Sequence, residues 1–279
     1  MGIKTSLFSW WVGEAASGGL HNYYAMRRSL RDWWRTKEYW YSDSRLLEFQ
    51  DSHGDEVCVV VGNGPSLNET DTSLLADGVC SFGMNRIYIG LDTLGFSPTF
   101  YVSVNKLVIE QCWDDIKQLP MPKFLSSHCG VRPHRETDAI FLRTQGVKSC
   151  GPAFSRDLVA GLWEGATVTY VALQLAFWMG FRKVILIGVD HNFTTKGAPN
   201  KEVVSEGDDP NHFAGGYFGK GFRWQLPDLE VSEMAYRMAD YTFRLAGREI
   251  VDCTVGGKCP VFRKGDLAEE LVSSPPPTA

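Results

Sequence analysis

A short glycine-containing turn holds the residue types in this sequence that are best suited to binding a phosphate. Residues 62–66 read Gly-Asn-Gly-Pro-Ser. Glycine lets a ligand approach the backbone closely, and proline suits the first position of a helix. A turn of this kind between a strand and a helix presents backbone N–H groups to a phosphate or a nucleotide. The alternative interpretation is that residues 62–66 form a tight strand-to-helix turn that binds no ligand.

This turn differs from two common phosphate-binding motifs. It is not a P-loop, because no Gly-Lys-Ser/Thr follows it, and it lacks the third glycine of the dinucleotide fingerprint, where Leu67 stands instead. The motif therefore indicates an anionic ligand without identifying it.

Two histidines are candidates for proton transfer, because free imidazole has an ordinary pKa near 6.5. His212 lies in a long polar loop at residues 196–221, of a length that is usual for functional lids. His191 follows an apolar run and stands beside Asp190. An Asp190–His191 pair would be either an oriented base or a structural hydrogen bond.

The elements that must position these residues read as alternating strands and helices. Residues 57–61 are four valines and a cysteine, which is typical of a strand buried on both sides of a parallel sheet. Further strands are predicted at 79–84 and 99–104. The residues Asn63, Asn85 and Asn105 follow the three strands, so we expect them at one edge of the sheet, although each is also a common turn former.

The second half of the chain repeats the pattern. We predict a helix that ends at Gly180, a strand at 183–189, a helix from residue 227 and a last strand at 249–253. Short edge strands are predicted within 123–147, and a short capped helix at 71–78. The apolar residues of the helix from 227 are expected on one inward face: Val231, Met234, Ala235, Met238, Tyr241 and Leu245.

These elements predict an α/β fold, a mostly parallel sheet with helices on both faces (Rossmann-like), preceded by an aromatic-rich helical extension. We expect the extension at residues 1–54, a nucleotide-binding transferase domain at 55–265 and a disordered tail at 266–279. Tryptophans, tyrosines and arginines alternate in the extension. It either packs on the main domain or forms an interfacial surface for a second copy or a membrane.

Composition excludes several functional classes. The chain has 279 residues, of which 44% are hydrophobic and 22% charged, with a formal net charge of −5. This charge argues against a general nucleic-acid binder. The seven cysteines form no C-x-x-C pair, and His128, Cys129 and His134 lack a metal-ligand spacing, so neither a disulfide framework nor a metal site is predicted. No signal peptide or membrane-spanning run is evident, so we expect a cytoplasmic location, or a membrane-peripheral one.

The order of these motifs resembles two related groups of proteins. The turn at 62–66, the asparagine after the second strand, and the later helix and strand at 165–190 occur in that order in the small bacterial sialyltransferases that use CMP-sialic acid. They also occur in a bacterial and archaeal group that includes an archaeal 6-hydroxymethylpterin diphosphokinase. The resemblance covers roughly residues 57–257.

The resemblance implies roles for individual residues. Asn85 would contact the donor, His212 would be the general base, and Tyr217, placed only by its position in the loop, would steady the departing phosphate. The nucleotide would be held by the glycine turn, Gly62, Asn63, Gly64, Pro65 and Ser66. The start of the later helix, Gly165, Ala166 and Thr167, would also bind the donor.

The resemblance and the residue types together predict a glycosyltransferase that moves a sugar from a nucleotide-activated donor, CMP-sialic acid or another CMP-ketosugar, to a glycan acceptor. It would need no cofactor. One alternative is a 6-hydroxymethylpterin diphosphokinase-like transferase that uses ATP and Mg²⁺ held by Asp190, Asp208 and Asp209. A second alternative is a nucleotide-binding protein without catalysis.

Overall fold

The computed structural model describes residues 36–76, 78–129, 138–146, 151–194, 197–207 and 209–272. The chain forms two compact units, residues 1–42 and 43–279. Of the first unit only the beginning of helix α3 (Thr36–Glu48) is described, so the expectation of an interface in the aromatic extension lies largely outside the described residues. Residues 43–54 belong to the second unit, where Asp51 N donates to Trp178 O (3.0 Å) and His53 stacks on Phe181.

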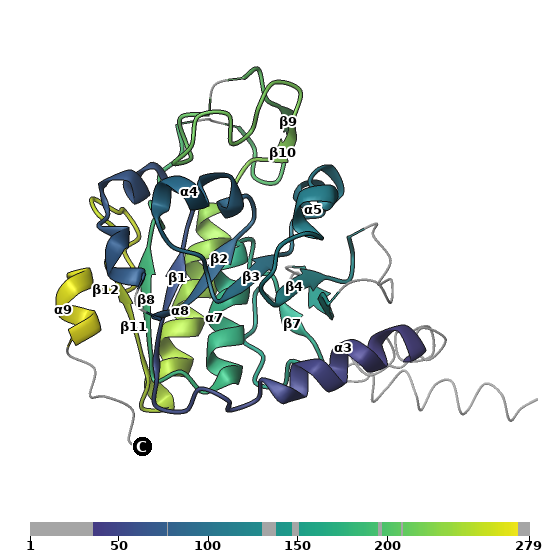
Figure 1. Ribbon diagram of the computed structural model, residues 1–279, viewed down its shortest axis with the longest axis vertical. Helices are drawn as coiled ribbons and strands as arrows, with labels where there is room; N and C mark the ends of the chain where they lie inside the picture. Colours follow the sequence, from purple (N-terminus) through teal and green to yellow (C-terminus); the bar gives the residue numbers. More distant parts are fainter. Residues whose placement is uncertain are drawn as a thin grey trace, which may run out of the picture. The chain divides into compact units, whose positions relative to one another are not determined.

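The second unit is built on one eight-stranded sheet in which every pairing is parallel, in the order β12-β11-β8-β1-β2-β3-β4-β5 (Figure 1). This confirms the predicted α/β fold. The strands are β1 (Val57–Val61), β2 (Cys80–Met84), β3 (Phe100–Ser103), β4 (Lys123–Ser126), β5 (Ile140–Leu142), β8 (Lys183–Ile187), β11 (Glu249–Asp252) and β12 (Arg263–Lys264).

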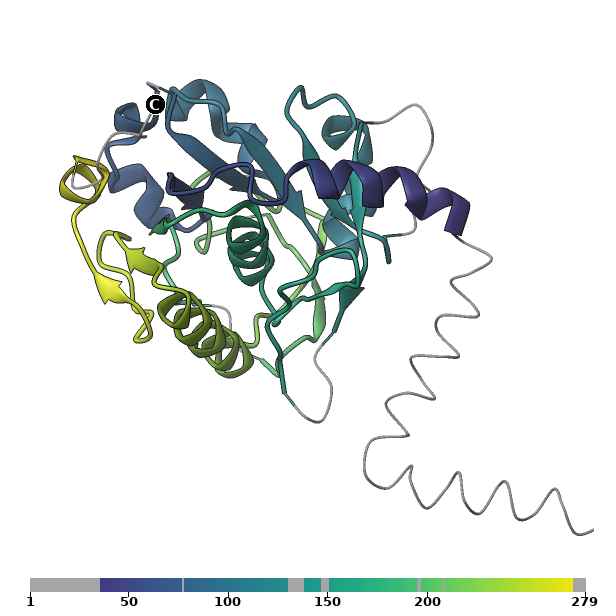
Figure 2. The same ribbon diagram turned by 90° about the horizontal axis from the view of Figure 1, so that it is seen from below.

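Strand β1 lies between β8 and β2 in the middle of the sheet, and both faces of its valine run are covered. Val59, Val60 and Val61 are fully buried. Helices α7 (Val168–Met179) and α8 (Leu229–Leu245) lie along one face of the sheet, and short helices lie on the other (Figure 2). The short helices in the first half of the chain are η2 (Pro65–Glu69), η3 (Thr72–Leu75), η4 (Ile87–Gly90), α4 (Leu91–Leu94), α5 (Lys106–Gln111) and α6 (Trp113–Ile116). Burial on both faces explains why β1 has no polar alternation.

The strand order reverses between β1 and β8. From β1 the chain moves outward through β2, β3, β4 and β5, and it then returns to β8 on the other side of β1. In open parallel sheets, ligands bind beyond the carboxyl ends of the strands at such a reversal. The topology therefore places a crevice where the turns after β1 and β8 meet.

The predicted inward face of α8 is wrong. Ala235 is buried, but Met234, Met238, Tyr241 and Leu245 are exposed. The face that packs on the core carries Ser232, Ala235, Tyr236, Ala239, Thr242 and Phe243. Apolar residues occupy more than one face of this helix, and Phe243 contacts the rings of Phe154 and Phe177. Periodicity alone could not choose between the faces.

Several short elements also differ from the prediction. The helix predicted at 71–78 is the shorter 3₁₀-helix η3. The long polar loop contains strand β9 (Glu202–Val204), which pairs antiparallel with β10 (Arg223–Gln225), and a further small pair joins β6 (Thr144–Gln145) to β7 (Leu162–Trp163). In the described ranges, no helix is both long and apolar enough to cross a membrane. Peripheral contact with a membrane stays a prediction.

The expectation of a disordered tail from residue 266 is wrong for its first part, because Leu267–Val272 form helix α9. Glu270 on this helix accepts hydrogen bonds from Lys183 Nζ (2.8 Å) and Arg263 Nη1 (2.6 Å). Lys183 is buried at the start of β8, so α9 supplies a carboxylate that compensates its charge. Residues 273–279 lie outside the described residues.

The Glu270 cluster predicts a pH-dependent stability. Hydrogen bonds from Arg263 and Lys183 lower the pKa of Glu270 from 4.5 to about 2. Because the pKa is depressed in the folded state, the stabilisation is complete above pH 4.5 and is lost as the pH falls towards 2. We expect Glu270→Gln to lower the free energy of unfolding by about 2 kcal/mol at pH 7, and by less at pH 3, in urea titrations. A difference that does not change with pH would contradict this.

Candidate functional site

A cavity of about 490 Å³ opens at the carboxyl edge of the sheet, beyond the ends of β1, β2, β3, β4 and β8. The cavity is lined by most of the residues that the sequence predicts for the site: Gly62, Asn63, Gly64, Asn85, Asn105, Ala166, Thr167, Asp190, His191, His212 and Tyr217. Pro65, Ser66 and Gly165 do not line it. The cavity thus lies at the reversal of the strand order, where the fold favours a ligand.

The N–H groups of the two glycines in the turn are not free for a ligand, contrary to our expectation. Gly62 N donates to Ile187 O (2.8 Å), and Gly64 N donates to Gly188 O (2.9 Å). A Cβ atom on Gly62 would overlap the carbonyl oxygen of Gly188, and one on Gly64 would overlap the carboxylate of Asp190. The two glycines are therefore required by the close packing of the turns after β1 and β8, and replacing Gly64 would disturb the fold as well as any ligand.

Asp190 joins the same two turns. Its carboxylate accepts from Ser66 N (3.2 Å) and from Ser66 Oγ (2.6 Å). The predicted pairing of Asp190 with His191 is therefore wrong. Adjacent residues in the turn after β8 direct their side chains to different partners.

Loss of the Asp190 carboxylate is expected to destabilise the unit. In Asp190→Ala both donors of the buried Ser66 lose their acceptor, so we expect a loss of about 1.5–3 kcal/mol in the free energy of unfolding. Asp114→Ala removes a carboxylate that is 86% exposed and paired with Lys117, and should cost under about 1 kcal/mol. Equal losses in the two urea titrations would contradict the role given to Asp190.

The three asparagines at the strand ends are held differently. Asn63 Nδ2 donates to Met84 O (3.0 Å), which leaves the buried Asn63 Oδ1 without a partner in the described part of the chain. Asn85 adopts a left-handed backbone (φ 49°), and its Oδ1 accepts from Ser103 Oγ. Asn105 caps helix α5 by accepting from Leu107 N and Val108 N. Asn63 therefore offers the clearest unmet acceptor for a ligand.

Helix α7 begins at the cavity. Gly165 and Ala166 both have left-handed backbones (φ 55° and 58°), and Thr167 caps the helix by accepting from Thr169 N. Gly165 faces inward, because a Cβ atom there would contact Tyr170 and Ala235. The strained turn therefore directs the positive end of the α7 dipole towards the cavity, where it favours an anion.

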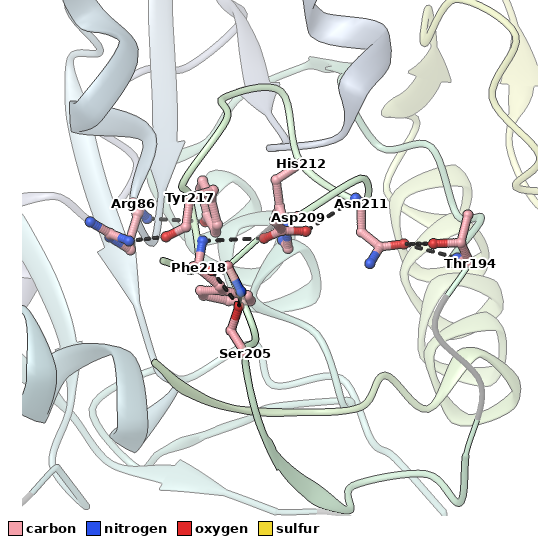
Figure 3. Close-up of polar contacts among 9 residues, drawn as sticks. Arg86, Thr194, Ser205, Asp209, Asn211, His212, Tyr217 and Phe218 are labelled. Carbon is pink, nitrogen blue, oxygen red and sulfur yellow. Dashed lines mark hydrogen bonds and ion pairs between the residues drawn. The ribbon is translucent and has the colours of Figure 1, made fainter. Parts of the chain in front are cut away.

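His212 is oriented by a buried carboxylate. Its Nδ1 lies 2.7 Å from Asp209 Oδ2, and the side chain of Asp209 is only 2% exposed (Figure 3). Burial on its own would raise the pKa of Asp209, but the hydrogen bond and charge of His212, with backbone N–H bonds from Asn211 and Phe218, lower it overall. Asp209 thus remains a carboxylate that fixes the ring, and no described residue is bonded to His212 Nε2.

The loop around His212 is held in place by several contacts (Figure 3). Asn211 Oδ1 accepts from Thr194 N (2.8 Å), and Ser205 Oγ donates to Phe218 O (2.6 Å). The ring of Tyr217 stacks on His212 at 3.9 Å between centroids. Arg86 donates through its guanidinium to Tyr217 O and through its backbone N to Tyr217 Oη. The sequence showed His212 but not that Asp209 and Tyr217 orient it.

Tyr217 is therefore placed differently from our expectation for a residue that steadies a phosphate. It is almost fully buried, and burial raises its pKa well above the ordinary value. Its hydroxyl accepts from Arg86 N. In its observed position, the ring of Tyr217 stacks on the ring of His212 and helps to hold it in place.

Two further histidines line the cavity. His191 Nε2 lies 3.1 Å from Glu233 Oε1 on α8, and His128 Nδ1 lies 3.2 Å from Thr144 Oγ1 beyond β4. Sequence reasoning missed Glu233 and gave His128 no role, although His128 follows a predicted edge strand in the same way that the asparagines follow theirs.

The sequence matches a described protein family over more than half of its length. Residues 37–196, more than half of the chain, match the model of the family described as 6-hydroxymethylpterin diphosphokinase MptE-like. The chain belongs to the MptE-like family. The family description is that of a transferase, and the matched range ends before Asp209 and His212.

Other comparisons add little to the MptE-like assignment. No curated protein matches the chain. A solved structure of the MAf glycosyltransferase from Magnetospirillum magneticum AMB-1 is similar, with 14% sequence identity and a TM-score of 0.49 over 82% of this chain. The chain spans 38% of that protein's length.

The diphosphokinase description implies a nucleotide with Mg²⁺, but two of the three carboxylates considered for such a site, Asp190 and Asp209, are bonded to other side chains. Both carboxylate oxygens of Asp190 are bonded to Ser66, and Asp209 is bonded to His212. Within the described residues no three His, Cys, Asp or Glu side chains are grouped to hold a metal ion. Asp208 lies outside the described residues.

Proposed function

We propose that the chain transfers a glycosyl group from a nucleotide-activated sugar, CMP-sialic acid or a similar CMP-ketosugar, to a hydroxyl of a glycan. The observation that carries this proposal is the His212–Asp209 pair at the cavity, with Nδ1 of His212 fixed 2.7 Å from a buried carboxylate. An imidazole that is held by a hydrogen bond at one ring nitrogen can accept the proton of a hydroxyl at the other.

The proposed reaction begins with the acceptor hydroxyl near Nε2 of His212. Asp209 accepts a hydrogen bond from Nδ1–H, which leaves Nε2 as the basic nitrogen, and the stacked Tyr217 keeps the ring plane fixed. When His212 removes the proton, the acceptor oxygen attacks the anomeric carbon and the nucleotide phosphate departs. General base catalysis of this kind contributes about 10²–10⁴-fold to a rate.

The donor is proposed to lie along the reversal of the strand order. Its phosphate would lie near the start of α7, at Thr167, where the helix dipole favours negative charge. Asn63 Oδ1 is a buried acceptor that requires a donor group, such as a hydroxyl or an amino group of the nucleotide. Neither contact requires a metal ion when the leaving group is a single phosphate.

A second candidate is a pyrophosphoryl transfer from ATP to 6-hydroxymethylpterin, because the family description names that activity. The two candidates differ in the nucleotide and in their need for Mg²⁺. The third candidate is a nucleotide-binding protein without catalytic activity. Such a protein would bind the nucleotide but would release no product.

A thermal-shift screen tests the proposal. We expect CMP at about one hundred times its Kd to raise the free energy of unfolding by about 2.7 kcal/mol, with or without Mg²⁺. For a unit of this size, that corresponds to a rise of several degrees in Tm. A shift with ATP that requires Mg²⁺, and none with CMP, would favour the diphosphokinase. CDP, UDP, GDP and AMP serve as further comparisons.

A further inference from the structure

His191, which lines the same cavity, forms a second imidazole–carboxylate pair with Glu233. His191 Nε2 lies 3.1 Å from Glu233 Oε1, and the His191 side chain is only 6% exposed. The backbone of His191 is left-handed (φ 53°), which is uncommon for a residue with a side chain. Nδ1 of His191 has no hydrogen-bond partner among the described residues. An unpartnered ring nitrogen on a largely buried side chain at a cavity points to a ligand.

His191 and His212 lie on different walls of the cavity. The ring of His191 is 6.0 Å from that of Tyr236, whose hydroxyl lies 3.4 Å from Oγ1 of Thr167, the cap of α7. The loop of His212 is instead tied to the turn after β1, since Phe213 N donates to Asn63 O (2.9 Å). His191 therefore lies on the α7 side and His212 on the β1 side.

The α7 side needs a group that can meet the charge of a departing phosphate. Among the described residues that line the cavity, Lys106 is the sole lysine or arginine, and its Nζ lies 3.6 Å from Glu110. Asp190 and Glu164 add negative charge to the lining. His191 is thus the group on that wall best placed to supply a proton.

We propose that His191, held by Glu233, contacts the donor's phosphate and protonates it as it leaves, an inference that rests on the proposed glycosyl transfer. The acceptor oxygen bonds to the anomeric carbon as the bond between that carbon and the phosphate oxygen breaks with its electron pair. His212 Nε2 gains the acceptor's proton, and the proton on His191 Nδ1 passes to the phosphate oxygen. His191 enters the step as the imidazolium, leaves it neutral and is reprotonated from solvent.

Glu233 is then a positioning residue for His191. Its carboxylate accepts a hydrogen bond from Nε2–H of His191, so Nδ1 is the nitrogen left to face the donor's phosphate. Glu233→Gln should weaken the phosphate contact in the same direction as His191→Gln, but less. Asp240→Asn is the matched control, because Asp240 forms an i,i+4 ion pair with Arg244 on the same helix, as Glu233 does with Arg237, but makes no bond to His191.

The test compares the affinities of CMP and cytidine, which differ only in the phosphate, by calorimetry. We expect the wild-type ratio of the two affinities to fall by about tenfold or more in His191→Gln, while the cytidine affinity, the His212→Gln ratio and the Asp240→Asn ratio stay unchanged. We also expect kcat for CMP-sialic acid to fall by about 10²-fold in His191→Gln.

The outcomes separate this inference from the proposed function. If the wild type transfers sialic acid and His191→Gln retains both its ratio and its kcat, the inference is overturned while the proposed function stands. If no sugar is transferred but the ratio still collapses in His191→Gln, the phosphate contact is supported and glycosyl transfer is not. A wild type that binds CMP no better than cytidine overturns the inference.

Discussion

Replacing His212 by glutamine is expected to lower the rate of sugar transfer by about 10²–10⁴-fold while CMP still binds. Glutamine retains a hydrogen-bonding side chain of similar size but cannot take up a proton at neutral pH. Asp209→Asn should lower the rate less, because it removes the carboxylate that orients Nδ1 and leaves the imidazole in place. Initial rates of CMP release and calorimetry with CMP measure the two effects separately.

The chain offers a matched control for this substitution. His53 forms the same kind of i,i+3 pair with Glu56 (3.1 Å) and stacks on Phe181, but it does not line the cavity. His53→Gln should keep the wild-type rate. Full activity in His212→Gln would contradict the assignment of the base, and loss of CMP binding would show that His212 acts mainly in binding.

Adding one methyl group at Gly62 is expected to destabilise the whole unit. The Cβ atom of Gly62→Ala would overlap the carbonyl oxygen of Gly188, which is backbone and cannot turn aside. Overpacking of this kind costs about 1–3 kcal/mol and at times more, and it would separate the two turns that carry the cavity. We expect Tm to fall by about 2–4 °C for each kcal/mol lost.

Gly54→Ala is the matched control, because a Cβ atom there meets nothing within 4 Å and its backbone is not left-handed. Its Tm should stay within about 2 °C of the wild type. A Gly62→Ala protein that melts with the wild type would show that the turns after β1 and β8 have room between them, contrary to their described packing.

The sheet was accessible to sequence reasoning because its signals are local. The valine run at 57–61 has no polar alternation, which indicates burial on both faces, and an asparagine follows each of the first three predicted strands. In a parallel sheet those ends share an edge, so Asn63, Asn85 and Asn105 were placed at one cavity without any knowledge of distances.

The partners of the site residues were not accessible, because they depend on contacts between distant segments. Asp190 is next to His191 in sequence, yet it bonds to Ser66, while His191 reaches Glu233 on α8. Asp209 was considered only as a metal ligand, and its bond to His212 depends on how the loop folds. The inward face of α8 was also not accessible, because the segments that pack against the helix decide which of its apolar residues are buried.

The nucleotide product identifies the reaction most directly. Incubating the wild-type protein with CMP-sialic acid and a glycan acceptor, and separately with ATP, Mg²⁺ and 6-hydroxymethyl-dihydropterin, distinguishes the two transfers by the nucleotide released. Our account predicts release of CMP, without a requirement for Mg²⁺, and loss of that release in His212→Gln. Release of AMP from the second mixture, with CMP-sialic acid left intact, would contradict it.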